Sequence, residues 1–315
     1  MTTLDWTALT RSPAKEDLYR RETYFREGLR DAEDVFGSEE PARILRDSAL
    51  LMLKPDGLAA GKLAAVLGYL ADHDFTVAAV EELRFGRFQW RELWRYQLTS
   101  ATLDRLAVND LLLGAGPALA LLLRSGPRHE LPATVRLSVL KGSATLEAQK
   151  PGTLRSLLGQ PNRVLSYIHV ADEPADLLRE LGLLFEEPAR RRLLAGLARG
   201  RLGPGDAEVR DRMLERFPAP GRSLSPDEAL RRVTGVVGTA AAAAGESAAL
   251  TAVRGRLDRM KNGERVEWLP FLRDLETLGA RPDRWDLAVL GTTHIVYDEP
   301  GHPKVLTNPD PQSWK

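Results

Sequence analysis

The 315-residue chain contains no cysteine, and only 8 of its 44 basic side chains are lysines. The absence of cysteine excludes disulfides, thiolate nucleophiles and cysteine-based metal sites. Acidic side chains also number 44, so neither a nucleic acid nor a membrane is expected as a partner. The N-terminus has no apolar signal-peptide core, and the small-residue run at 236–245 is too short to span a bilayer. A soluble cytoplasmic protein is expected.

The middle of the chain, residues 47–186, alternates apolar runs with amphipathic stretches. Four runs predict strands: 48–53, 75–83, 117–123 and 164–170. Helices are expected over 63–70, 90–113 (as two), 131–140 and 174–185, whereas 142–161 lacks periodicity and predicts a long, functional loop. The order predicts an α+β protein with a ferredoxin-like βαββαβ domain.

The flanking regions have a different character. Residues 1–46 are charged and predict an N-terminal helical extension with a helix over about 15–31. Residues 187–315 predict a mainly helical C-terminal domain with a strand over 285–297 and an irregular tail. His294 and His302 lie near acidic residues of this tail, but histidines in a Pro- and Gly-rich segment are more often simply exposed. We therefore assign no metal site.

A histidine near the end of the fourth predicted strand is followed by a helix that carries a glutamate. From His169 to Asp172 the strand advances roughly 10 Å, and from residue 173 to Glu180 the helix returns roughly 10 Å. If the helix folds back along the strand, Glu180 lies level with His169. Glu180 also sits within the apolar stripe of its helix, where a carboxylate needs a partner. An imidazole fixed at one nitrogen keeps the other free to act as a nucleophile.

Each candidate residue also has a purely structural explanation. His169 taken alone would be a hydrogen-bonded structural histidine, and strand parity does not say which face of the sheet it occupies. Lys54 precedes Pro-Asp-Gly, which is strong turn chemistry and could simply end a strand. Arg155 could be an ordinary surface arginine. Trp90 and Trp94, one helical turn apart, are explained as core or interface anchors.

Several segments resemble nucleoside diphosphate kinases, in that family's order and at nearly its spacing. They are Leu53-Lys54-Pro55-Asp56-Gly57 with the helix after it, Gly116-Pro117 before an apolar strand, Lys150-Pro151-Gly152-Thr153-Leu154-Arg155, and His169-Val170-Ala171-Asp172 with Glu180-Leu181-Gly182-Leu183-Leu184-Phe185. The resemblance covers about 48–185 and implies a ferredoxin-like domain of a kind that usually assembles. A homo-oligomer is therefore expected.

The resemblance implies a phosphotransferase that moves the γ-phosphoryl group of a nucleoside triphosphate, through a phosphohistidine, to a nucleoside diphosphate or related acceptor. His169 would accept the phosphoryl group, and Glu180 would hold its ring. Lys54 and Arg155 would neutralise phosphate charge. ATP or another nucleoside triphosphate is the implied partner, and Mg²⁺ is expected on the bound nucleotide rather than in a protein cage.

Several contacts expected from the resemblance are altered. Ser166 stands where the family has an asparagine three residues before the histidine, and Ala144 replaces a threonine after the loop glycine. Ser138 stands where the family usually has a loop arginine, and Arg136 and Lys141 lie nearby in the sequence. The auxiliary site candidates are Tyr96, Arg136, Ser166 and Asp172.

A stacking aromatic expected about nine residues after Tyr96 is also absent, since Arg105 and Leu106 occupy that neighbourhood. Losing one preorganised polar contact can cost about 3 kcal/mol of transition-state stabilisation. Two functional classes therefore stay open. One is a histidine-phosphorylating nucleotide phosphotransferase, and the other is a degenerate kinase-like module that binds nucleotide or acts as a scaffold without phosphotransfer.

Overall fold

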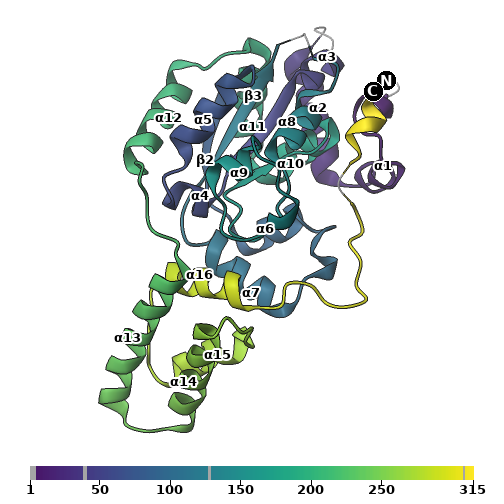
Figure 1. The fold of residues 1–315 in the computed structure, drawn as a ribbon. Coiled ribbons are helices and arrows are strands. Elements are labelled where there is room, and N and C mark those ends of the chain that lie inside the picture. Colours follow the sequence, from purple (N-terminus) through teal and green to yellow (C-terminus); the bar gives the residue numbers. More distant parts are fainter. Residues whose placement is uncertain (1–4, 38–40, 127–128, 308) are drawn as a thin grey trace.

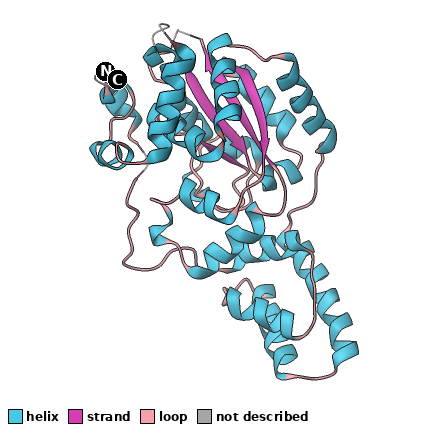
Figure 2. Ribbon diagram, turned by 180° about the vertical axis from the view of Figure 1, so that it is seen from behind, coloured by secondary structure: helices cyan, strands magenta, loops and turns pink. Residues whose placement is uncertain are grey.

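The computed structural model of the chain describes residues 5–37, 41–126, 129–307 and 309–315. Its four-stranded sheet has the spatial order β2-β3-β1-β4, and every neighbouring pair is antiparallel (Figures 1 and 2). The strands are β1 (Ser48–Leu53), β2 (Phe75–Leu83), β3 (Ala118–Ser125) and β4 (Ile168–Val170). This is the strand order of a ferredoxin-like βαββαβ domain, so the predicted fold class is confirmed.

Helices connect the strands and cover the sheet. Two lie between β1 and β2, three between β2 and β3, three between β3 and β4, and α10 follows β4. They are α4 (Pro55–Ala59), α5 (Leu63–Asp72), α6 (Arg87–Leu93), η2 (Leu98–Ser100), α7 (Leu103–Leu113), α8 (Ala133–Lys141), η3 (Leu146–Ala148), α9 (Leu154–Leu158) and α10 (Pro174–Leu184). The loop predicted at 142–161 therefore contains the short helices η3 and α9.

The central strand β1 is buried along its whole length. Alternate side chains of a strand point to opposite faces. Leu51 and Leu53 accordingly join one apolar core, while Leu50 and Met52 join the other. A strand covered on both faces needs an uninterrupted apolar run, which the sequence provides up to Leu53. The chain becomes polar at Lys54, where the candidate site begins.

The N-terminal region, as far as it is described, forms four helices. They are η1 (Trp6–Ala8), α1 (Pro13–Tyr19), α2 (Thr23–Phe36) and α3 (Pro41–Arg46). Of these, α2 packs on α10, and α3 packs on α2 and β1. The single helix predicted over 15–31 is wrong, because the backbone is extended at Glu22, whose carboxylate binds Tyr96 and Arg179. α2 and α10 approach closely at Gly182, where a Cβ atom would lie 1.9 Å from the carbonyl oxygen of Tyr24.

The region beyond residue 186 is mainly helical, as predicted. Its helices are α11 (Glu187–Arg199), α12 (Pro204–Arg216), α13 (Pro226–Ala244), α14 (Ala248–Lys261), α15 (Trp268–Thr277), α16 (Arg284–His294) and η4 (Pro311–Trp314). α11 and α12 lie against β2, whereas α13, α14 and α15 project away from the sheet (Figure 1). The domain boundaries at 46/47 and 186/187 stay a prediction. None of the described helices combines the length and the apolar character needed to cross a membrane.

The strand predicted over 285–297 is wrong, because α16 occupies most of this range. Asp283 caps the helix by accepting the N–H of Trp285 at 2.8 Å. At Gly291 a Cβ atom would lie 2.5 Å from Val108 of α7, so the helix packs closely there. A short apolar run does not by itself distinguish a buried helix from a strand.

Candidate active site

His169 lies on the edge strand β4, opposite Met52 of β1. Its Nε2 is 2.9 Å from Oε1 of Glu180, which α10 carries back along the strand. Glu180 is buried, and its second carboxylate oxygen has no hydrogen-bond partner among the described residues. The contact predicted from the rise of strand and helix is therefore present.

The other ring nitrogen of His169 faces Trp94. The indole Nε1–H donates to Nδ1 at 3.3 Å, and the two rings meet edge to face with centroids 5.4 Å apart. An indole nitrogen only donates, so Nδ1 carries the lone pair and the Nε2–H donates to Glu180. Trp90 is a buried core residue as predicted, but Trp94 lies at the site.

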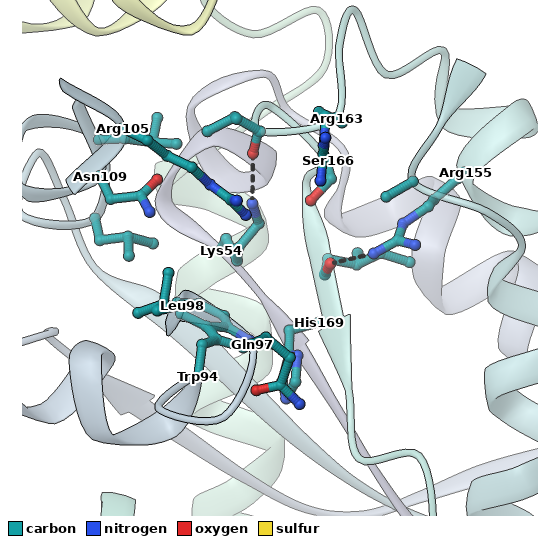
Figure 3. Close-up of a pocket in the computed structure, with 15 residues that line it drawn as sticks. Lys54, Trp94, Gln97, Leu98, Arg105, Asn109, Arg155, Arg163, Ser166 and His169 are labelled. Atoms are coloured by element: carbon teal, nitrogen blue, oxygen red, sulfur yellow. Dashed lines mark hydrogen bonds between the residues drawn. The ribbon is translucent and has the colours of Figure 1, made fainter. Parts of the chain in front are cut away.

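His169 and Trp94 line a cavity of about 150 Å³ (Figure 3). Four cationic side chains line the same cavity: Lys54, Arg105, Arg155 and Arg163. The other polar lining residues are Gln97, Asn109 and Ser166, and no carboxylate lines the cavity in the part of the chain that the structure describes. A low-dielectric pocket with four cations attracts anions.

Lys54 is buried and Arg155 is half-buried, and both donate to backbone carbonyls. Nζ of Lys54 donates to Val164 at 3.0 Å and lies 3.5 Å from the carboxylate of Asp56. Burial lowers the pKa of Lys54, an effect that the Asp56 carboxylate opposes. Nη1 of Arg155 donates to Gly142 at 2.9 Å, and its buried Nε has no described partner. Burial lowers the pKa of Arg155 to about 10, so this guanidinium is charged at neutral pH.

A residue with unusual backbone geometry fixes this part of the pocket. Tyr167 has φ +61°, a left-handed conformation that costs a non-glycine residue on the order of 1–2 kcal/mol. Its N–H donates to Asp56 at 3.0 Å, and its carbonyl accepts the N–H of Lys54 at 2.8 Å. These contacts hold Lys54 beside the segment that carries Ser166, so that both line the cavity.

Two arginines of the pocket are paired with the C-terminal tail. Nη1 of Arg105 lies 2.5 Å from one carboxylate oxygen of Asp298, and Nη1 of Arg163 lies 2.8 Å from the other. Asp298 is held against the pocket wall by an antiparallel bridge to Ala101. The sequence pointed to Arg105 only as a departure from the family pattern. No sequence pattern assigned Arg163 or Asp298 to the pocket, because these two residues lie far apart in the chain.

Ser166 is the auxiliary candidate that lines the cavity; Tyr96 and Arg136 do not. The hydroxyl of Tyr96 donates to Glu22, and burial raises the pKa of Tyr96 to about 12. Arg136 donates to the carbonyl of His73 at 2.7 Å, close to the start of β2 and therefore at the other end of the sheet. The assignment of Tyr96 and Arg136 to the site is corrected accordingly.

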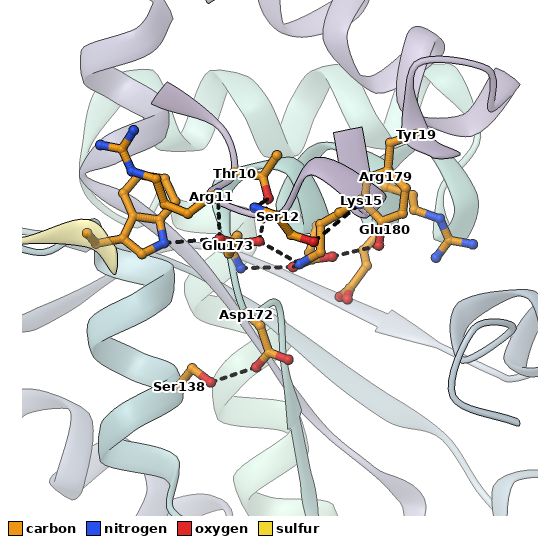
Figure 4. A network of polar contacts seen from close by, with 12 residues as sticks. Thr10, Arg11, Ser12, Lys15, Tyr19, Ser138, Asp172, Glu173, Arg179 and Glu180 are labelled. Carbon is orange, nitrogen blue, oxygen red and sulfur yellow. Dashed lines mark hydrogen bonds and ion pairs between the residues drawn. The ribbon is translucent and has the colours of Figure 1, made fainter. Parts of the chain in front are cut away.

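Asp172 also lies outside the cavity lining and is half-buried beside Ser138 and Lys141; Figure 4 shows its contact with Ser138. Ser138 donates to it at 2.6 Å and Lys141 at 2.8 Å. Burial raises the pKa of Asp172, but the Lys141 ammonium and the two hydrogen bonds outweigh burial and hold the pKa well below its ordinary value. Ser138 and Lys141 thus fix the turn after β4 and do not face the cavity.

No group of three or more histidine, aspartate or glutamate side chains in the described parts of the chain is arranged to hold a metal ion. Buried nitrogen atoms without a hydrogen-bond partner occur at the cavity instead, at Nε of Arg105 and Nε of Arg155. Unpaired buried donors are costly and mark places where a ligand can bind. The donor set therefore suits an anion.

Sheet order and site together define a ferredoxin-like domain with a carboxylate-held histidine at a cationic pocket. Residues 47–189 match the model of the nucleoside diphosphate kinase family. These residues therefore form a divergent nucleoside diphosphate kinase-like domain, and the rest of the chain lies outside the match.

Two similar solved structures are themselves nucleoside diphosphate kinases. That from Aquifex aeolicus is 21% identical, covers 44% of this chain and 95% of its own, and has a TM-score of 0.37. That from Halobacterium salinarum, in complex with CDP, is 19% identical, with coverages of 40% and 76% and a TM-score of 0.33. No curated protein matches the chain.

Proposed function

We propose that the pocket binds the phosphate chain of a nucleoside triphosphate and that His169 accepts its γ-phosphoryl group. The observation that supports this best is the 2.9 Å pair between His169 and Glu180 at the wall of a cavity lined by four cations. Phosphoryl transfer needs little covalent chemistry from the protein. It depends mainly on a positioned nucleophile and on groups that offset phosphate charge.

In the proposed step, the lone pair on Nδ1 of His169 attacks the γ-phosphorus. The P–N bond forms as the bond to the β,γ-bridging oxygen breaks, and the nucleoside diphosphate leaves with that electron pair. The imidazole ring gains positive charge, which the buried carboxylate of Glu180 offsets through Nε2–H. Lys54 and Arg155 would offset charge on the phosphates. A nucleoside diphosphate or a related acceptor then takes the phosphoryl group from Nδ1 by the reverse chemistry.

Mg²⁺ would reach this site as part of the nucleotide complex. Divalent magnesium prefers oxygen ligands, especially carboxylates and phosphates. The described cavity lining offers cations, amides and a hydroxyl but no carboxylate. The described side chains of the lining would therefore leave Mg²⁺ to the phosphate oxygens and act on the phosphates directly.

A second function is a nucleotide-binding module without phosphotransfer. It is supported by the hydrogen bond from Trp94 to Nδ1, which occupies the lone pair that must attack phosphorus. It is also supported by Lys54, whose ammonium already binds Val164 and Asp56. In this alternative His169 is a structural residue and the pocket serves only for recognition.

Labelling with γ-³²P-ATP distinguishes the two functions. The full chain should acquire an acid-labile, base-stable label on His169, and His169→Asn should acquire none. Glu180→Gln should slow labelling by about ten- to a hundredfold, because it removes the charge that stabilises the developing imidazolium. Glu147→Gln, an exposed change on η3, is the control and should label at the wild-type rate. A folded protein without label on His169 would refute phosphotransfer. Equal rates for Glu180→Gln and wild type would refute the role of the pair.

A further inference from the structure

The C-terminal tail is hydrogen-bonded to residues 96–102, a segment that contributes Gln97 and Leu98 to the wall of the pocket. Thr102 donates its N–H to Tyr297 at 3.1 Å, and Glu299 donates its N–H to Ser100 at 2.7 Å. Farther along, Val305 donates its N–H to Tyr96 at 2.9 Å. The backbone is therefore bound to the wall on both sides of residue 298.

The end of the tail is anchored on the N-terminal region. The indole of Trp314 donates to the carboxylate of Glu173 at 3.0 Å, and the guanidinium of Arg11 lies 4.8 Å from the Trp314 ring centroid. Glu173 is fully buried and pairs with Lys15 at 2.8 Å (Figure 4). Both ends of the segment after α16 are thus fixed, and the tail is held across this side of the pocket.

The carboxylate of Asp298 spans two cations of the pocket. One oxygen lies 2.5 Å from Arg105 and the other lies 2.8 Å from Arg163. Asp298 keeps about a third of its side-chain surface exposed, whereas that of Arg105 is largely buried and its Nε has no described partner. Two oxygens on one central atom are also what a phosphate group offers to a pair of guanidinium groups.

The size of the cavity leads to the same conclusion. Its volume of about 150 Å³ is below the roughly 300–1,000 Å³ typical of small-molecule sites. A ligand with several phosphates needs more room than this and must extend past the cavity. Asp298 does not line the cavity, but it holds two lining arginines, Arg105 and Arg163, which such a ligand would reach.

We propose that Arg105 and Arg163 form a second phosphate subsite of the pocket and that Asp298 occupies this subsite until a phosphate ligand displaces its carboxylate. Lys54 and Arg155 hold the remaining phosphates on the His169 side. The inference rests on the proposed function only in taking the ligand to be a nucleotide or polyphosphate, and it requires no transfer to His169. Ligand binding and the position of the tail are then coupled.

The test is calorimetric titration of the full chain with inorganic tripolyphosphate, a probe without base or sugar. Asp298→Asn should bind about tenfold more tightly than wild type, because the competing charge is gone. Glu299→Gln removes the same charge one residue away, at an exposed side chain, and should bind like wild type. Arg163→Gln should bind about tenfold more weakly.

Affinity of Asp298→Asn within twofold of wild type, or weaker, would overturn the proposal, as would the absence of tripolyphosphate binding. Hydrogen exchange on the wild-type chain gives a measurement that needs no substitution. Saturating tripolyphosphate should accelerate exchange in peptides from 296–306, whose amides include those of Glu299 and Val305, and unchanged exchange would also overturn it. A protein that binds tripolyphosphate as predicted but is never labelled at His169 would refute only the phosphotransfer.

Discussion

Replacement of Trp94 by phenylalanine tests whether the indole restrains the proposed nucleophile. The substitution keeps an aromatic ring against His169 and Phe85 but removes the N–H that donates to Nδ1. At 3.3 Å this is a long hydrogen bond between neutral groups, which contributes a net stabilisation of about 0.5–1.5 kcal/mol. The bond must break before Nδ1 attacks phosphorus. Its loss should therefore raise the rate of phosphorylation by about two- to tenfold.

The assay is single-turnover labelling by γ-³²P-ATP, with stability followed by thermal unfolding. Trp90→Phe is the matched control. It also removes an indole N–H, one that donates to Asp110 at 3.0 Å, and neither Trp90 nor Asp110 lines the cavity. Trp90→Phe should label at the wild-type rate as long as it is folded. If Trp94→Phe is folded but slower than the control, the indole positions the imidazole instead of restraining it, and the reasoning is refuted.

Two further predictions concern charge. Nucleotide affinity should fall steeply with ionic strength, because binding depends on the cations of the pocket. Lys54→Ala should make affinity less dependent on salt. A titration that shows tight binding at every salt concentration would contradict this prediction. The free energy of unfolding should decrease as pH falls below about 4. The pKa of Asp172 in the folded state is held below its ordinary value of 3.8, because the carboxylate is paired with Ser138 and Lys141. Protonation of Asp172 weakens these contacts and so destabilises the folded state. Asp172→Asn should remove this part of the pH dependence in urea unfolding, and an unchanged profile would show that other carboxylates cause it.

The Asp298 contact changes how the departures from the family pattern are understood. Arg105 stands where a stacking aromatic is expected, and Ser138, which replaces the usual loop arginine, binds Asp172 outside the cavity. The cationic character of the pocket is therefore carried partly by Arg105 and Arg163, side chains that also hold the tail. We expect phosphate recognition in this chain to depend on these two arginines more than the family pattern alone would suggest.

The sequence alone determined the sheet and the histidine–carboxylate pair. Three local properties support these predictions: the uninterrupted apolar run of β1, the helix that follows His169, and the rise per residue of strand and helix. They predict a wholly apolar strand at 48–53, and they bring Glu180 level with His169 provided that the helix folds back along the strand, as it does in the structure. The ordered family motifs extend this reading to Lys54 and Arg155, which do line the cavity.

Only the tertiary structure decided what surrounds the second nitrogen of His169 and which cations are paired. The contact of Trp94 with Nδ1 depends on how α6 and the segment after it pack over β4. The contact of Asp298 with Arg105 and Arg163 depends on the path of a tail that is distant in sequence. Neither arrangement leaves a periodic pattern, because each consists of single contacts between separate elements. For the same reason the apolar run at 285–297, which fits a strand as well as a helix, is fixed as α16 only by its packing on α7.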